Sequence, residues 1–326
     1  MKRIAILDDY QNAALSVPDW QRLTGRAGVE VFRDTLADTD ALARRLADFE
    51  ILVTIRERTR FSAALLRRLP ALELLALTGR NSGQVDVTAA TEQGVLVTET
   101  EGSGASPVEL TMGLILAVAR RIPHEERALR EGRWQTGVGV ELRGKTLGIL
   151  GLGRIGSRIA AFGNLLGMRV LAWGPTLTDE RAAAAGGTTR VSLETLFRES
   201  DVVSLHLRLS EMTRGVVTAP LLALMKPTAF LVNTARGPLV DETALIAALR
   251  ARRIAGAALD VYDVEPLPAN HPLIALDNVV LTPHVGYVTG AVYGIFFRQV
   301  VEAIEAFLDG KLPPRTVNPE VWRRPA

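Results

Sequence analysis

The sequence contains no cysteine, and this absence removes several classes of chemistry at once. It excludes a disulfide framework, thiolate ligands for zinc or iron–sulfur clusters, and a cysteine nucleophile. Lysine is also scarce, and the excess of basic over acidic residues gives a formal charge of only +2. Because the basic side chains form no long tract of the kind that binds nucleic acids, we expect no nucleic-acid partner.

Long hydrophobic runs are missing as well. The longest, residues 110–119, has about half the length of a membrane-spanning helix. Near the N-terminus, only four apolar residues precede Asp8 and Asp9, fewer than the apolar stretch of a secretory signal peptide. We therefore expect no membrane association and a cytoplasmic location, with which the lack of cysteine agrees.

The 326 residues, 48% of them hydrophobic, predict two globular domains at about 150 residues each. Short β-branched runs alternate with segments whose apolar residues recur every three or four positions, which predicts parallel sheets covered by helices on both faces. The fold class is thus α/β, with two doubly wound parallel-sheet domains. The predicted strands span residues 3–7, 29–32, 51–55, 72–77, 95–98, 146–150, 169–173, 202–205, 230–233, 255–259 and 279–282.

A glycine-rich turn is the strongest local motif. It follows the predicted strand at 146–150 and opens a predicted helix, which is the context of a dinucleotide-binding turn. In such a turn the first glycine allows the tight bend, the second lets the backbone approach a pyrophosphate, and the third lets the helix pack on the strand. The free N–H groups of the helix start would then face the phosphates. The residues predicted to bind the cofactor here are Gly151, Gly153, Arg154, Ile155 and Gly156.

The next strand ends without the carboxylate that NAD sites usually place on the ribose hydroxyls. Trp173 is followed by Gly174, Pro175 and Thr176, and no arginine stands there to hold a 2′-phosphate. We therefore predict NAD as the cofactor and leave NADP open.

A second phosphate-binding pattern, G-x-x-x-x-G-K-T at residues 139–146, lacks the required context. Its Lys-Thr pair should start a helix, but Thr146 starts a predicted strand. A phosphate-loop nucleotide hydrolase is therefore the weaker alternative.

Three polar residues follow three predicted strands. Arg236 comes after the strand at 230–233, Glu265 after a short loop beyond 255–259, and His284 after 279–282. Ligands of open parallel sheets bind outside the carboxyl ends of the strands, so these side chains are expected to face one crevice beside the glycine turn. A guanidinium grips a carboxylate through two hydrogen bonds, and an imidazole exchanges protons near neutral pH. A neighbouring carboxylate orients that imidazole and favours its protonated form. Together they suit hydride transfer to a 2-oxo acid.

At this point the chain resembles the D-isomer-specific 2-hydroxyacid dehydrogenases. The matching motifs come in the family's order and spacing, at residues 141–156, 201–206, 225–228, 233–237, 258–266 and 281–284. The resemblance implies an oxidoreductase that moves a hydride between NAD(P) and C2 of a D-2-hydroxy or 2-oxo acid, without a metal. It implies that Arg236 binds the substrate, that His284 is the acid/base, and that Glu265 is the partner of His284.

The resemblance also implies a wider set of contacts. Arg80, Asn81 and Ser82 would lie in a loop that offers backbone N–H groups to the substrate carboxylate. Asn81 stands where glycine is usual, and since asparagine tolerates left-handed backbone we expect the loop shape to be retained. Beside the glycine turn, the residues implied to surround the dinucleotide are Trp173, His206, Thr213, Thr234, Ala235 and Asp260.

The family's organisation implies a Rossmann cofactor domain, residues 101–284, inserted in a flavodoxin-like substrate domain made of residues 1–100 and 285–326. A dimerisation arm at residues 106–134 implies a homodimer, and a C-terminal regulatory domain is not expected. A non-catalytic, NAD(H)-sensing corepressor of the same fold is the alternative function. The identity of the 2-hydroxy acid, the physiological direction and the role of Tyr287 stay open.

Overall fold

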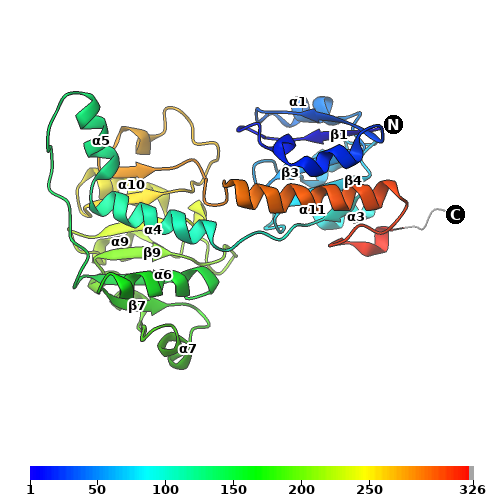
Figure 1. Cartoon of the computed structure of the whole chain (residues 1–326). Helices are drawn as coiled ribbons and strands as arrows, with labels where there is room; N and C mark the ends of the chain where they lie inside the picture. Colours follow the sequence, from blue (N-terminus) through cyan, green and yellow to red (C-terminus); the bar gives the residue numbers. More distant parts are fainter. Residues whose placement is uncertain (323–326) are drawn as a thin grey trace. The chain divides into compact units, whose positions relative to one another are not determined.

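The computed structural model describes residues 1–322 and divides the chain into two compact units (Figure 1). Unit 1 comprises Met1–Ser103 together with the segment from Val288 onward, and unit 2 comprises Gly104–Tyr287. Unit 1 is thus built from both ends of the chain and unit 2 from its middle.

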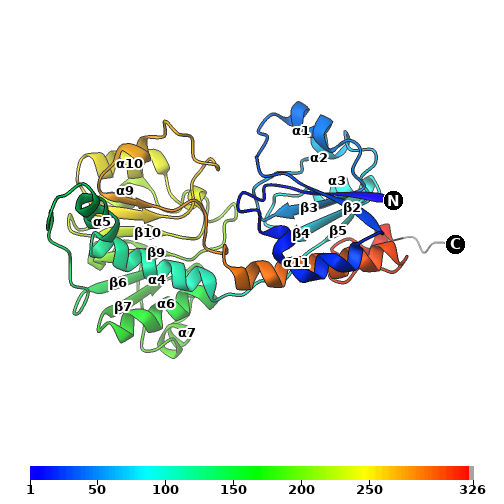
Figure 2. The same cartoon turned by 45° about the horizontal axis from the view of Figure 1, so that its top comes forward.

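Unit 1 contains a five-stranded parallel sheet in the order β2-β1-β3-β4-β5. The central strands β3 and β4 are buried at every residue, because helices cover both faces of the sheet (Figure 2). Helices α1, α2 and α3 pack on one face, and the long helix α11 lies on the other (Figure 2). The strands are β1 (Lys2–Ile6), β2 (Ala27–Val31), β3 (Ile51–Ile55), β4 (Leu74–Thr78) and β5 (Leu96–Thr98), and the helices are α1 (Thr39–Leu46), α2 (Ala63–Leu66), α3 (Val87–Glu92) and α11 (Gly290–Leu308).

Unit 2 contains a seven-stranded parallel sheet in the order β12-β11-β10-β9-β6-β7-β8. Helices α4 and α6 pack on one face of this sheet and α8, α9 and α10 on the other. The strands are β6 (Thr146–Leu150), β7 (Arg169–Trp173), β8 (Thr189–Arg190), β9 (Val202–Leu205), β10 (Phe230–Asn233), β11 (Gly256–Leu259) and β12 (Val279–Leu281). The helices are α4 (Ser106–Ala119), α5 (Ile122–Arg130), α6 (Arg154–Leu165), α7 (Asp179–Ala184), α8 (Leu193–Glu199), α9 (Ala219–Leu224) and α10 (Glu242–Arg250).

The strand order of unit 2 locates its ligand edge. From β6 the chain moves outward to β7 and β8, and then returns to place β9 on the other side of β6. The order therefore reverses between β6 and β9, and the crevice outside the carboxyl ends of strands at such a switch point is where open α/β sheets bind ligands. The glycine turn that follows β6 lies at this point.

The predicted fold class is confirmed, and each predicted strand occurs with its ends shifted by at most two residues. Strand β8 was not predicted, because two exposed residues are too short to show any periodicity. Thr146 opens strand β6, so residues 139–146 lack the helix start that a phosphate loop requires.

Candidate active site

Two glycines of the turn after β6 are required by the packing of the backbone itself. Gly151 has φ +104°, and a Cβ there would lie 2.8 Å from the carbonyl carbon of His206. A Cβ on Gly156 would lie 2.2 Å from the carbonyl oxygen of Gly151, so helix α6 approaches the turn too closely for any side chain. Both residues serve the close strand–turn–helix packing.

Gly153 differs from these two glycines because a Cβ there would meet nothing within 4 Å. It is the N-cap residue of α6, and no side chain caps this helix end. The first N–H groups of α6 therefore have no side-chain acceptor and can donate to an anion. The open space above Gly153 and these donors fit the pyrophosphate of a dinucleotide, with Arg154 in the first turn and Ile155 packed against the core.

Two arginines, Arg181 on α7 and Arg190 on β8, have partners in the segment that follows β7. Trp173 packs against the core, and Gly174 and Pro175 follow it. The Arg181 guanidinium donates to the carbonyl oxygen of Thr176 at 3.0 Å. Arg190 forms an exposed ion pair with Asp179 at 3.4 Å, so basic and acidic groups balance around this loop. The structure thus agrees with the sequence that no carboxylate directly follows β7.

The predicted cofactor residues after β9 and β10 are held by local hydrogen bonds. Desolvation by burial lowers the pKa of His206 to about 3, and its Nε2 lies 2.9 Å from Ser204 Oγ. The imidazole is therefore neutral at physiological pH. Thr213 Oγ1 donates to the carbonyl of Arg208 at 2.7 Å, and Thr234 Oγ1 lies 2.7 Å from Thr111 Oγ1.

The loop that carries Arg236 is clamped by a residue that the sequence analysis did not select. Asn233, buried at the end of β10, accepts a hydrogen bond from the Ala235 N–H and donates one to the Arg236 carbonyl. Arg236 Nη1 donates to the Ala235 carbonyl at 2.6 Å. A Cβ on the next residue, Gly237, would lie 2.0 Å from the Tyr262 carbonyl carbon, so the loops after β10 and β11 touch. The asparagine side chain readily hydrogen-bonds to the backbone of a following turn. An asparagine at the end of a predicted buried strand is thus the signal that could have identified Asn233.

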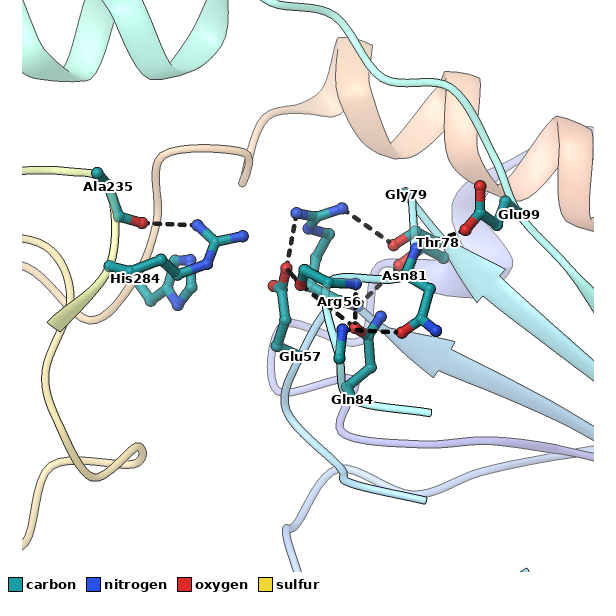
Figure 3. A network of polar contacts seen from close by, with 12 residues as sticks. Arg56, Glu57, Thr78, Gly79, Asn81, Gln84, Glu99, Ala235 and His284 are labelled. Atoms are coloured by element: carbon teal, nitrogen blue, oxygen red, sulfur yellow. Dashed lines mark hydrogen bonds and ion pairs between the residues drawn. The ribbon is translucent and has the colours of Figure 1, made fainter. Parts of the chain in front are cut away.

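His284 and Glu265 meet although nineteen residues separate them. The Nδ1 atom of His284 lies 2.6 Å from Glu265 Oε2, and Glu265 Oε1 accepts the Tyr262 N–H at 2.9 Å. Their side chains are 20% and 31% exposed, so the pair is sheltered but accessible to a small ligand. Tyr287 packs its ring edge-on against His284, with 5.6 Å between the ring centroids. Figure 3 includes His284 together with Ala235 of the neighbouring loop.

Asp260 supports the His284 turn. This buried carboxylate accepts hydrogen bonds from Thr282 Oγ1, the Val285 N–H and the Gly286 N–H, at 2.6, 2.8 and 2.9 Å. These bonds hold a turn in which His284 itself adopts a left-handed φ of +51°. Burial raises the pKa of Asp260, although the three hydrogen bonds oppose that shift. Asp260 is therefore bonded to the turn that carries His284, a contact that its predicted place beside the dinucleotide did not include.

The predicted substrate loop lies in unit 1, after β4 (Figure 3). Its shape does not depend on left-handed backbone at Asn81, because the positive φ angles fall on Gly79 and Gly83 instead. Asn81 stabilises the loop through its side chain, whose Oδ1 accepts the N–H groups of Gly83 and Val85. We expected the loop shape to depend on left-handed backbone at Asn81, and this reason is wrong. The side-chain amide of Asn81 stabilises the loop, not its backbone conformation.

Two of the three expected N–H donors of this loop already have acceptors. The Asn81 N–H donates to Glu99 at 2.7 Å, and the Ser82 N–H donates to Gln84 at 2.7 Å. Within residues 1–322, the Arg80 N–H has no hydrogen-bond acceptor.

Neither a metal-binding cluster nor a membrane-spanning helix occurs within residues 1–322. In residues 1–322 no group of three or more His, Asp or Glu side chains is placed to hold a metal ion. No helix in that part of the chain has the length and apolar character needed to cross a bilayer.

Comparisons with known proteins agree with the motifs. The family model described as "D-isomer specific 2-hydroxyacid dehydrogenase, NAD binding domain" matches residues 112–286. The glyoxylate reductase of Aeropyrum pernix is 45% identical over 272 residues, which cover 80% of this chain and 81% of the relative. The D-3-phosphoglycerate dehydrogenase of Methanocaldococcus jannaschii is 37% identical over 282 residues, which cover 86% of this chain but 53% of the relative. The chain therefore spans about half the length of that dehydrogenase.

A solved structure extends the similarity to the fold. The phosphoglycerate oxidoreductase from Vibrio cholerae O395 matches with a TM-score of 0.91 and 44% sequence identity, covering 95% of this chain and 99% of the other. The chain belongs to the D-isomer-specific 2-hydroxyacid dehydrogenases, which are NAD(P)-dependent oxidoreductases acting on the CH–OH group of their donors.

Proposed function

We propose that His284 is the acid/base of a 2-oxo acid reductase, that Glu265 orients it, and that Arg236 binds the substrate. The observation that carries this proposal is the 2.6 Å contact between His284 Nδ1 and Glu265 Oε2. It occurs beyond the carboxyl ends of β11 and β12, which are neighbours in the sheet that also carries the glycine turn.

The side chains have separate tasks in the reduction. The bound nicotinamide supplies the hydride that reaches C2 of the 2-oxo acid. Arg236 presents a planar fork of N–H groups to the substrate carboxylate, which fixes the orientation of the carbonyl. His284 gives the proton on Nε2 to the carbonyl oxygen, while the hydrogen bond from Nδ1 to Glu265 fixes the orientation of the ring. In the oxidation direction His284 takes the hydroxyl proton back.

The names of several relatives suggest which small acids to test first. Their names include glyoxylate reductase and hydroxypyruvate reductase, the latter from Thermotoga maritima with 37% identity over 90% of this chain and 96% of the relative. We therefore take glyoxylate and hydroxypyruvate as the first candidates, with NADH or NADPH as the reductant. The Arg80 N–H is the donor of the substrate loop that a carboxylate can use without displacing an existing bond.

The test is a panel of 2-oxo acids with NADH and NADPH, on the wild type and on His284→Asn. Asparagine tolerates the left-handed backbone of position 284, so the turn is expected to survive. Loss of the proton donor should lower turnover by about 10²–10⁴-fold and leave cofactor affinity, measured by fluorescence titration, nearly unchanged. Wild-type turnover in His284→Asn would refute the role of His284. Tight cofactor binding with no turnover of any acid by the wild type would favour the sensor alternative.

We also propose that the protein forms a homodimer and is located in the cytoplasm. Several large apolar side chains are exposed along α5 and the segment after it, and their exposure is unfavourable unless a partner covers them. They are Ile122, Leu129, Trp134 and Val138, which are 53%, 58%, 76% and 93% exposed. Light scattering on purified protein tests the assembly: twice the chain mass supports a dimer, and the single-chain mass argues against it.

A further inference from the structure

Helix α4 contacts the turn that carries His284. The helix lies on the sheet of unit 2 and packs on β10, β11 and β12 (Figure 1). In its first turn, Ser106 Oγ donates to the Gly286 carbonyl oxygen at 2.7 Å. A Cβ on Gly286 would lie 3.7 Å from Leu110 Cδ2 and 3.9 Å from Pro107 Cα. The His284 turn therefore rests directly on the first two turns of α4.

The same part of α4 also contacts the loop after β10. Thr111 is completely buried, and its Oγ1 lies 2.7 Å from Thr234 Oγ1. The same Thr111 oxygen lies 2.7 Å from the carbonyl oxygen of Pro107, four residues earlier in the helix. Thr234 is half-buried and directly follows β10, two residues before Arg236. The Thr111 hydroxyl thus stands between a backbone carbonyl and a side chain of the candidate site.

These two contacts fix the direction of both hydrogen bonds. Thr111 has one hydroxyl proton, and the Pro107 carbonyl can only accept. Without a proton between them, the two oxygens would repel each other at 2.7 Å, so Thr111 donates to Pro107. Thr111 can then only accept from Thr234, and Thr234 donates its own hydroxyl proton to Thr111. The Thr234 oxygen keeps lone pairs but has no proton for a further partner.

This direction determines which ligand group Thr234 can bind. An oxygen without a free proton accepts hydrogen bonds, and it cannot donate one to the carboxylate or the carbonyl of a 2-oxo acid. In the proposed function, Arg236 and His284 bind those two acceptor groups. The nicotinamide end of the cofactor carries one N–H donor group, the NH₂ of its carboxamide, and this group needs an acceptor.

We propose that Thr111 is a positioning residue that makes Thr234 an acceptor for the carboxamide NH₂ of the nicotinamide cofactor. This inference rests on the proposed function, since it requires the nicotinamide to lie at the carboxyl ends of the strands of unit 2, where His284 and Arg236 act. Thr111, Thr234 and the His284 turn all belong to unit 2 and all contact α4 or form part of it.

The experiment measures cofactor binding by calorimetric titration, without substrate. It compares NADH or NADPH, whichever binds more tightly, with its 3-acetylpyridine analogue, in which a methyl group replaces the carboxamide NH₂. For the wild type we expect the natural cofactor to bind about three- to tenfold more tightly, the contribution of one neutral hydrogen bond. Thr234→Val removes the acceptor, and Thr111→Val leaves the Thr234 proton free to donate to either nucleotide. Each variant should reduce the ratio of the two Kd values about threefold or more.

Two further variants separate positioning from a structural role. Thr111→Ser keeps the hydroxyl and should retain the wild-type ratio. Thr91→Val is the matched control in unit 1. The Thr91 hydroxyl donates to the carbonyl four residues earlier, that of Val87, at 2.8 Å, and it accepts a hydrogen bond from Asn318 Nδ2 at 2.9 Å. Thr91 therefore makes the same two kinds of hydrogen bond as Thr111, and Thr91→Val should leave the ratio unchanged.

The outcomes distinguish this inference from the proposed function. If the wild type binds no nicotinamide dinucleotide, the proposed function fails. If the wild type binds the natural cofactor and the analogue equally well, or if Thr234→Val weakens both by the same factor, the acceptor role of Thr234 is refuted while the proposed function stands. A ratio that falls in Thr234→Val but not in Thr111→Val would refute the role of Thr111. Should Thr111→Val not fold, Thr111→Ala makes the same test with a smaller side chain.

Discussion

Two glycines of one turn provide a matched test of the cofactor site. A Cβ at position 156 would lie 2.2 Å from the Gly151 carbonyl oxygen, which is a backbone atom and cannot rotate away. We therefore expect Gly156→Ala to force the helix from the strand, at a cost of about 1–3 kcal/mol or more in the free energy of unfolding. For a unit of this size, each kcal/mol lowers Tm by about 2–4 °C.

Gly153→Ala should behave differently, because the space above Gly153 is empty and its φ of −94° suits alanine. Replacing an N-cap glycine by alanine costs about 0.5–1 kcal/mol, so the melting temperature should fall by only a few degrees. Cofactor binding should suffer much more, since the added methyl group pushes the pyrophosphate away from the N–H donors of α6. Losing one charge-assisted hydrogen bond costs about 1.5–3 kcal/mol, or roughly tenfold to a hundredfold in Kd.

The assay is calorimetric titration with NADH and NADPH, together with thermal melts, on the wild type and both variants. The expected pattern is a folded Gly153→Ala with weak binding and a clearly destabilised Gly156→Ala. A Gly153→Ala protein that binds both nucleotides with wild-type Kd would refute the assignment of this turn to the pyrophosphate.

Two further predictions concern the groups that position the chemistry. Burial raises the pKa of Asp260 above its usual 3.8, so the folded state binds a proton on this carboxyl more tightly than the unfolded state. This proton therefore contributes to the free energy of unfolding in full below about pH 4. The contribution is lost as the pH rises through the raised pKa. The destabilisation caused by Asp260→Asn should therefore be larger at pH 4 than at pH 7 in urea titrations, and a pH-independent difference would contradict this reasoning. Arg236→Lys should lower kcat/KM by about 10-fold or more, because an ammonium cannot reproduce two parallel hydrogen bonds; wild-type steady-state kinetics would remove Arg236 from the site.

Local patterns were enough to predict the fold class and the strands. The glycine turn after β6 and the polar residues after β10, β11 and β12 were visible because each depends on a short stretch of sequence next to a buried strand. The contact between His284 and Glu265 agrees with this reasoning, since parallel strands bring their carboxyl ends to one edge of a sheet.

The supports of the site could not be predicted in the same way. The Asp260 carboxylate holds the His284 turn, and the Glu57 carboxylate accepts the Ser82 hydroxyl, through contacts that span 22 to 26 positions of sequence. No periodicity marks such pairs. Asn81 shows the same limit, because its residue type suggested a backbone role, whereas the amide acts through hydrogen bonds to Gly83 and Val85.

The most direct test of the central claim follows the transferred hydrogen itself. The protein is incubated with glyoxylate and nicotinamide cofactor carrying deuterium at C4 on one face or the other, and the glycolate is examined by mass spectrometry and NMR. If the hydride is transferred directly, the wild type should place deuterium at C2 of glycolate from a cofactor labelled on one face of C4 and not from a cofactor labelled on the other. At the same enzyme concentration, His284→Asn should form almost no labelled glycolate. Glycolate formed without deuterium from either face, or formed equally fast by His284→Asn, would contradict the account.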